Sequence, residues 1–302
     1  MTSLYTHRTE NIRKTWFMFT FFFIIVIGIG WVFGQVYENS AILVYAVLFS
    51  VGMSFVSYWW SDKIVLAMSR ARPVTREDAR ELYNVVENLC IAAGLPTPKI
   101  YIIDEPSPNA FATGRNAEHA VVAVTTGLLE RLNKTELEGV IAHELSHIGN
   151  HDMLVSTAVV VLVGFISLLS DFFRQSLFFG GMRRRDDREG NAGAIFMIIG
   201  IALAILAPII ATLMRFAISR RREFLADTSG ALLTRYPEGL ISALEKISHD
   251  PTPLRVATNT TAHLWFDDPF DKPGQKVSWL TKLFLSHPPV EERIAALRGM
   301  KV

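Results

Sequence analysis

Cysteine is nearly absent from this chain, since Cys90 is the only one among 302 residues. A single cysteine excludes an internal disulfide and any cysteine-rich metal site. A charge excess is also missing: 30 Lys and Arg residues stand against 29 Asp and Glu residues, for a net charge of +1. The charge balance therefore gives no general basic surface for nucleic acid. The chain has no internal repeat and no low-complexity tract.

Apolar residues, by contrast, are abundant and bunched. They make up 50% of the chain and form uncharged runs of the kind that cross membranes. The first run, residues 15–33, is long enough for a bilayer core of about 30 Å at about 1.5 Å per residue. A secretory signal peptide is the alternative, but the run is long for a signal core and no A-x-A cleavage site follows it. A second run, residues 40–60, completes a predicted transmembrane hairpin over residues 15–60.

Basic residues flank the outer ends of this hairpin. Arg13 and Lys14 precede the first run, Lys63 follows the second, and the connecting turn carries only Glu38. The positive-inside rule therefore makes residues 1–14 a cytoplasmic tail and places the chain after Lys63 in the cytoplasm.

Two further apolar runs cover residues 153–169 and about 194–214. The loop between them contains three arginines at residues 183–185, which the positive-inside rule would keep in the cytoplasm, whereas two full spans place them outside. A partly embedded hairpin would remove this conflict. We expect two full spans, forming a second transmembrane hairpin over residues 153–216.

Residues 61–152 have the pattern of soluble α/β structure. Apolar residues at helical spacing predict a helix over residues 78–93, and β-branched runs predict strands over residues 98–103 and 120–124. Another helix is expected to begin at Thr126.

The next helix carries the chain's main chemical signal. Thr135 with Glu138 predicts a capping box at its start, and we expect the helix to continue directly into the third apolar run. Within it, His143-Glu144-Leu145-Ser146-His147 is an H-E-x-x-H sequence. Two histidines four residues apart lie on one helix face and can bind one metal ion, with Glu144 beside the attacking water as a general base.

A catalytic zinc site needs a third protein ligand. The metzincin pattern would require Gly at position 150 and His at 153, where this chain has Asn150 and Met153, so that alternative fails. A second helix offers Glu223 and, four residues on, Asp227 on the same face. Glu223 can then bind the metal while Asp227 accepts the free ring N–H of a histidine ligand.

Four motifs together resemble the HtpX family of membrane zinc endopeptidases. They are H-E-L-S-H at residues 143–147, S-R-R-R-E-F-L-A-D at 219–227, P-N-A-F-A-T-G at 108–114 and S-H-P-P-V-E-E-R-I at 286–294. The resemblance implies an α-rich α+β fold: a zincin-like metalloprotease domain, in two parts at residues 61–152 and 217–302, interleaved with four transmembrane helices in two hairpins. It covers nearly the whole chain.

The resemblance also implies roles for single residues. One zinc ion per chain would be held by His143, His147 and Glu223, with Glu144 as base and Asp227 behind the ligands. An edge strand with Asn109, Ala110 and Phe111 would hold the substrate backbone, and His287 with Arg293 would stabilise the oxyanion. His7, His119, His249 and His263 show no metal-binding spacing.

The function implied is cleavage of misfolded or damaged membrane proteins, or of other unfolded polypeptides, at the cytoplasmic side of the cell membrane as quality control. No nucleic-acid partner is expected. Two alternatives are an intramembrane protease, which would need the H-E-x-x-H inside an apolar span, and a non-catalytic scaffold. The scaffold would need a fourth zinc ligand, for which His151 is the nearest residue.

Overall fold

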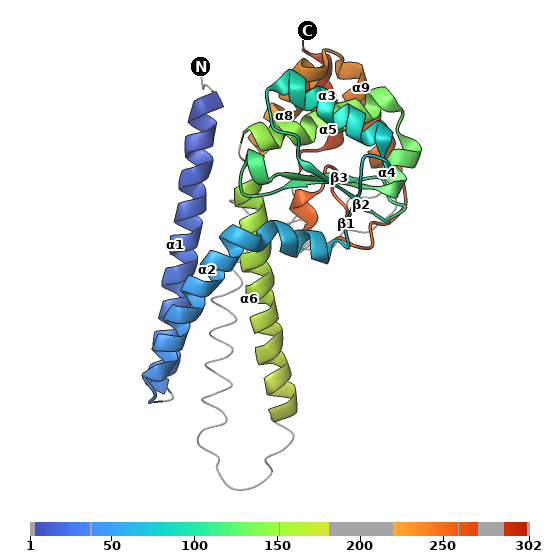
Figure 1. Ribbon diagram of the computed structural model, residues 1–302. Coiled ribbons are helices and arrows are strands. Elements are labelled where there is room, and N and C mark those ends of the chain that lie inside the picture. The colour runs from blue at the N-terminus through green and yellow to red at the C-terminus, as the bar shows by residue number, and fades with distance from the viewer. Residues whose placement is uncertain are drawn as a thin grey trace.

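The computed structural model describes residues 4–36, 38–150, 152–180, 220–258, 260–270 and 287–300. In these residues the chain is a helix-rich α+β protein with one four-stranded mixed sheet. Figure 1 shows the sheet and the helices around it gathered at one end, with long helices extending from them. This agrees with the expected α-rich α+β class.

The first two apolar runs are helical and form a hairpin. α1 (Leu4–Val36) takes in both the polar start and the first run, and α2 (Ala41–Met68) follows after a short turn. Segments Ile12–Trp31 and Ala41–Met68 are each long and apolar enough to cross a bilayer. In the described part of the chain a third candidate arises only if α5 and α6 are counted as one bent span.

The third apolar run begins a third long helix, α6 (Met153–Gly180). Its described part packs on α1, where buried Met18 and Phe22 lie against Ala158 and Leu162. Residues 194–214, the expected fourth run, lie outside the described residues. Of the four expected spans, the described residues therefore contain two candidate membrane helices, and α6 qualifies as a third only together with α5.

The sheet has the strand order β1-β2-β4-β3, from β1 (Arg72–Pro73), β2 (Lys99–Ile103), β3 (Ala110–Thr113) and β4 (Val121–Thr125). β2 and β4 are parallel, and they correspond to the two predicted strands. β3 pairs antiparallel with β4 alone, so it forms one edge of the sheet.

The two faces of the sheet pack against different parts of the chain because successive side chains point to opposite faces. One face, with Ile100 and Val122, joins the core under α3 (Arg80–Ala93) and α5 (Lys134–Gly149). The other face, with Phe111 and Ala123, packs on the end of α2, on α6 and on Trp265. Burial on both faces explains why the strands lack polar alternation.

The start of α5 differs from the prediction by two residues. The capping box is formed by Asn133 and Glu136: the Asn133 side chain accepts from the Glu136 N–H, and the Glu136 carboxylate accepts from the Asn133 N–H. Thr135 lies inside the first turn and donates to Asn133. Both candidate caps fit the sequence pattern, but Asn133 places Glu136 where Lys246 and Ser242 of α9 (Pro237–His249) can bind it.

The sequence pattern predicted that the H-E-x-x-H helix continues directly into the third apolar run. This prediction is wrong, because the helix ends before that run begins. α5 ends at Gly149, α6 begins at Met153, and their axes are bent by 84°. Asn150 caps α5, and the Asp152 N–H donates to the His147 carbonyl oxygen, which turns the chain back toward α5. This break brings Asp152 close to the second histidine of the motif.

Two C-terminal helices complete the layer around α5. α8 (Arg220–Thr234) packs along α5, and α11 (Val290–Arg298) lies against α8 and α9. Helix α4 (Thr126–Arg131) begins at Thr126 as predicted, with Thr125 as its N-cap.

Candidate metal centre

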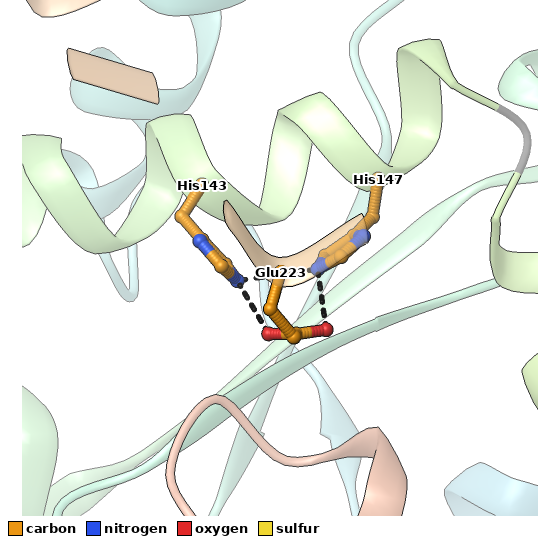
Figure 2. A group of neighbouring side chains, drawn as sticks. All are labelled: His143, His147 and Glu223. Atoms are coloured by element: carbon orange, nitrogen blue, oxygen red, sulfur yellow. Dashed lines mark hydrogen bonds and ion pairs between the residues drawn. The ribbon is translucent and has the colours of Figure 1, made fainter. Parts of the chain in front are cut away.

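Three side chains from two helices converge beside the sheet. His143 and His147 project from successive turns of α5, and Glu223 reaches them from the first turn of α8 (Figure 2). The Nε2 atoms of the two histidines lie 3.1 Å apart, and each lies 3.6 Å from one oxygen of Glu223. This is the group of residues that the sequence pattern proposed as metal ligands.

A close helix contact makes this convergence possible. Gly230 of α8 lies directly against α5, so that a Cβ there would come within 2.9 Å of the His143 backbone nitrogen. Any larger residue would push the two helices apart. Glu223 lies about two turns N-terminal to Gly230 on α8, so the spacing set at Gly230 also sets the reach of its carboxylate.

The donor set fits a small divalent cation such as zinc. Tetrahedral zinc with bonds of about 2.0–2.1 Å separates its ligand atoms by roughly 3.3 Å, close to the distances of 3.1 and 3.6 Å between these atoms. Both imidazoles use Nδ1–H for carboxylates behind them, so both Nε2 atoms face Glu223. Two nitrogen lone pairs and a carboxylate that meet in this way require a proton or a metal cation between them.

Asp227 and Arg293 hold His143 from behind. Nδ1 of His143 donates to Oδ1 of Asp227 at 2.9 Å. Arg293 in turn donates to the same carboxylate from Nε at 2.8 Å and from a terminal nitrogen at 2.7 Å, and donates to the Phe266 carbonyl at 3.0 Å. Burial would raise the pKa of Asp227, but the Arg293 guanidinium and the His143 ring lower it to about 2.

Asp152 holds His147 in the same way, and the sequence pattern did not identify it. Nδ1 of His147 donates to Oδ2 of Asp152 at 3.1 Å. Burial would lower the pKa of His147, but Asp152 and the charges of Glu223 and Glu144 raise it to about 9. Asp152 was missed because an unbroken helix would place residue 152 away from His147. His151, the residue next to it, lies outside the described residues.

Glu144 is buried at the centre of the site, with 2% of its surface exposed. Burial raises the pKa of its carboxyl group to about 7, Glu223 adds to the rise, and a backbone hydrogen bond with Ala112 opposes it. A carboxyl group with this pKa is suited to accept and release a proton near neutral pH.

His287 and Arg293, expected to act together, occupy different places. Nδ1 of His287 donates to Oε2 of Glu223 at 3.0 Å, which, against the effect of burial, raises the pKa of the imidazole. Its Nε2 atom is buried and has no hydrogen-bond partner among the described residues. Arg293 does not line the cavity, because Asp227 and Phe266 hold its guanidinium behind His143.

The cavity at this centre is small, about 40 Å³. Its wall contains the three candidate ligands, Glu144, His287, Ala112 and the segment from His263 to Phe266. At about 10–15 Å³ per water, it holds an ion and a few waters but no peptide. His263, which no spacing in the sequence marked, donates from Nε2 to the Ser156 carbonyl at 3.1 Å, and burial lowers its pKa to about 4.

The expected substrate strand is β3 with the residue before it. Asn109, Ala110 and Phe111 are all buried: Nδ2 of Asn109 donates to the Asp267 carbonyl at 2.9 Å, and the Ala110 carbonyl accepts from the Phe266 N–H at 2.8 Å. The outer edge of β3 is therefore already paired at Ala110. The part of the edge that faces Glu144 and the cavity is Ala112, two residues further along.

The sequence of this chain matches a known protein family. Residues 76–301 match the family described as Peptidase family M48, whose members are zinc metalloproteases. A protein of Caldanaerobacter subterraneus subsp. tengcongensis named "Protease HtpX homolog" is 44% identical over 303 residues, 99% of each chain. A "Protease HtpX homolog" of Dictyoglomus turgidum is 47% identical over 292 residues, 96% of this chain and 93% of that one.

Among solved structures, the crystal structure of S. mikatae Ste24p aligns with a TM-score of 0.49 and 22% identity, over 89% of this chain and 62% of that one. The family assignment comes from the sequence matches, which run through the H-E-x-x-H helix, α8 and α11. By these matches the chain belongs to peptidase family M48 and is a membrane-associated metalloprotease of the HtpX family.

Proposed function

We propose that this chain is a gluzincin-type endopeptidase that holds one zinc ion between His143, His147 and Glu223. The observation that carries the proposal is the meeting of these three side chains with Glu144 in one buried cavity next to an edge strand. Zinc bound there would polarise the scissile carbonyl and lower the pKa of the attacking water.

The protein groups around the ion have separate tasks. Glu144, whose pKa is raised to about 7, takes the proton of the attacking water and passes it to the leaving amine. His287 directs Nε2 toward the reacting carbonyl oxygen, while Glu223 holds its Nδ1 and favours the charged imidazole. A charged donor at that place stabilises a developing oxyanion.

The contacts of Arg293 favour positioning over direct oxyanion stabilisation. Its bonds to Asp227 and to Phe266 are short, and its side chain is 1% exposed. Arg293 therefore holds Asp227, and through it the ring of His143, in place. Reaching the cavity would require breaking a buried ion pair, which is costly.

An extended polypeptide would bind by adding a strand to β3. Because the Ala110 carbonyl is already bonded to Phe266, the part of the β3 edge that can accept a substrate strand is at Ala112. Asn109 and Ala110 instead anchor the segment that covers the site. Because the cavity is only about 40 Å³, this covering segment must move aside before a peptide reaches Glu144. Such a requirement favours unfolded chains, whose backbone is free to compete for a strand edge.

Membrane association and the charge pattern around α1 and α2 favour a cytoplasmic site and membrane-protein substrates. A direct test of the side uses Ala92→Cys, an exposed position on α3, because Cys90 itself is buried. A membrane-impermeant maleimide should label this variant in inverted vesicles and not in intact cells. Labelling in intact cells only would place the site on the other side.

The substrate class is tested in proteoliposomes that contain this chain and a second membrane protein. That protein is offered with a folded or with a destabilised cytoplasmic domain, and Glu144→Gln serves as the inactive control. We expect wild type to cut the destabilised form at least tenfold faster. Equal rates for both forms would contradict a quality-control role and leave the protease assignment in place.

A further inference from the structure

A second cavity lies where α2 passes beneath the sheet, as Figure 1 shows for these two elements. Its volume is about 760 Å³, far larger than the cavity at the metal centre. One wall is formed by aromatic side chains of α2, and the other by the strand ends and the turn around η1 (Ala117–His119). None of the residues around the metal centre takes part in it.

The aromatic wall belongs to the end of the second apolar run. Phe55, Trp59 and Trp60 are 54%, 42% and 42% exposed, and their rings touch, with centroid distances of 6.0 Å and 5.7 Å from Phe55 to the two tryptophans. Tryptophan is enriched at the boundary between hydrocarbon and headgroups. This wall therefore extends from the bilayer core to its polar surface.

Basic side chains lie on the polar side of the same cavity. Lys63 follows the aromatic residues on α2, Lys99 begins β2, and Arg115 follows β3. In the described part of the chain, no carboxylate lies within 4.0 Å of any of these three cations. Two carboxylates, Asp62 and Glu118, also line the cavity, so the cationic groups exceed the anionic ones by one.

Arg115 is held in place without being neutralised. Its guanidinium carbon lies 4.4 Å from the ring centre of Trp59, a cation–π contact. One of its terminal nitrogens lies 2.7 Å from Nε2 of His119, whose Nδ1 lies 2.7 Å from Oδ1 of Asn116. Nδ1 donates to the amide oxygen, and because a guanidinium group can only donate, Nε2 accepts from Arg115. The arginine keeps its charge and has donors left for an anion.

We propose that this cavity binds an anionic phospholipid, with its phosphate at Arg115, Lys63 and Lys99 and its acyl chain along Phe55 and Trp59. Two features select a lipid over a free phosphate. The aromatic wall gives no advantage to a small inorganic anion, and it lies at the end of a helix long and apolar enough to span the bilayer. The volume is also in the range of about 300–1,000 Å³ usual for small-molecule sites.

A bound lipid here would join the membrane helix to the catalytic part of the chain. Trp59 and Lys63 belong to α2, whereas Lys99 begins β2 and Arg115 lies just after β3, the strand at the substrate edge of the sheet. The lipid would therefore fix the depth of the sheet relative to the bilayer surface. This inference does not depend on zinc or on peptide cleavage.

The test measures lipid retention by native mass spectrometry of the whole chain released from detergent. Phosphatidylglycerol is compared with phosphatidylcholine of the same acyl chains, for wild type, Arg115→Gln and the triple variant Lys63→Gln/Lys99→Gln/Arg115→Gln. The matched control is Arg80→Gln/Lys134→Gln/Arg235→Gln, which removes equal charge from exposed sites away from this cavity. Melting temperature and helix content of each variant check that it is folded.

We expect wild type and the control variant to retain phosphatidylglycerol in preference to phosphatidylcholine. A loss of about fivefold per removed cation near an anionic surface predicts about fivefold weaker retention in Arg115→Gln and about a hundredfold in the triple variant. Equal loss in the control variant, or no preference in wild type, would overturn the proposal.

Two further outcomes would also overturn it. Displacement of the lipid by millimolar inorganic phosphate would show a site for a free anion. Slower cleavage of a membrane substrate by Arg115→Gln, with unchanged lipid retention, would assign the cavity to the polypeptide instead.

Discussion

Nδ1 of His147 lies 3.1 Å from Oδ2 of Asp152, across the break between α5 and α6. The residue that orients the second histidine thus comes from the point where the H-E-x-x-H helix ends and the next long helix begins. His143 receives the same support from Asp227, 84 positions away in the sequence. Both candidate ligand histidines are therefore held by buried carboxylates, one local and one distant.

Replacing Asp152 by Asn should weaken zinc binding by about 10–100-fold, the usual effect of losing a carboxylate behind a histidine ligand. The amide still fills the space but no longer favours the Nδ1–H tautomer by charge. Zinc affinity is measured by competition with a chromogenic chelator. Asp104→Asn, at an exposed position after β2, is the matched control and should bind zinc as wild type does. Equal affinity in Asp152→Asn and wild type would show that Asp152 has no such role.

Zinc affinity should rise with pH through the neutral range. In the metal-free site the pKa of His147 is raised to about 9, so at pH 7 its Nε2 carries a proton that zinc must displace. His143, whose pKa burial lowers to about 4, is already neutral there. Affinity is therefore expected to increase about tenfold per pH unit from pH 6 to pH 8, because one proton is displaced. An affinity that is constant over this range would contradict the geometry in which the two Nε2 atoms share a proton.

Breaking the pair of Asp227 and Arg293 should destabilise the protein strongly. Asp227→Asn leaves the buried Arg293 guanidinium without its counter-charge, and Arg293→Met does the same to the Asp227 carboxylate. Each single variant should lose about 3–5 kcal/mol of stability. The double variant should lose less than the sum of the two. Melting temperatures of the four proteins in detergent complete the cycle. Additive losses would show that the two side chains do not depend on each other.

The same pair predicts the direction of acid destabilisation. The pKa of Asp227 is lowered to about 2 in the folded chain, against about 3.9 in an unfolded one. Its contribution to stability is therefore present above about pH 4 and is lost as the pH falls toward 2. In Asp227→Asn the melting temperature should fall less steeply between pH 4 and pH 2 than in wild type.

Gly230→Ala should disturb the site from a distance. Its new Cβ would lie 2.9 Å from the His143 backbone nitrogen and 3.2 Å from the Ala142 carbonyl carbon, so α8 must move away from α5. We expect a stability loss of about 1–3 kcal/mol together with weaker zinc binding, because Glu223 moves with α8. Gly149→Ala, on α5 itself, meets only Leu95 at 3.8 Å and serves as the control. Unchanged zinc affinity in Gly230→Ala would show that the close approach of α8 to α5 at Gly230 does not control metal binding.

Local patterns in the sequence were sufficient for the first membrane hairpin, for α3, α4, β2 and β4, and for the group of candidate ligands. Helical spacing alone puts His143 and His147 on one face of a helix, and Glu223 with Asp227 on one face of another. Runs of β-branched residues identified β2 and β4, because the pattern that defines each strand lies within a few consecutive residues.

What the sequence did not predict depends on chain breaks and on distant contacts. Asp152 reaches His147 only because the helix stops at Gly149. The Gly149-Asn150 pair is a signal for that stop, but the apolar run that follows favoured a continuous helix. His263 and Arg293 come from segments far from the H-E-x-x-H helix, so their places in the wall or behind a ligand follow from packing alone. The pairing of Phe266 with Ala110 likewise needs the folded chain, and it moves the free strand edge to Ala112.

The most direct test of the account compares zinc content and cleavage of a labelled unfolded polypeptide in purified wild type, Glu144→Gln and the exposed control Glu130→Gln. We expect zinc in all three proteins, with cleavage by wild type and Glu130→Gln and a rate at least about a hundredfold lower in Glu144→Gln. Cleavage by Glu144→Gln at the wild-type rate, with zinc retained, would contradict Glu144 as the base.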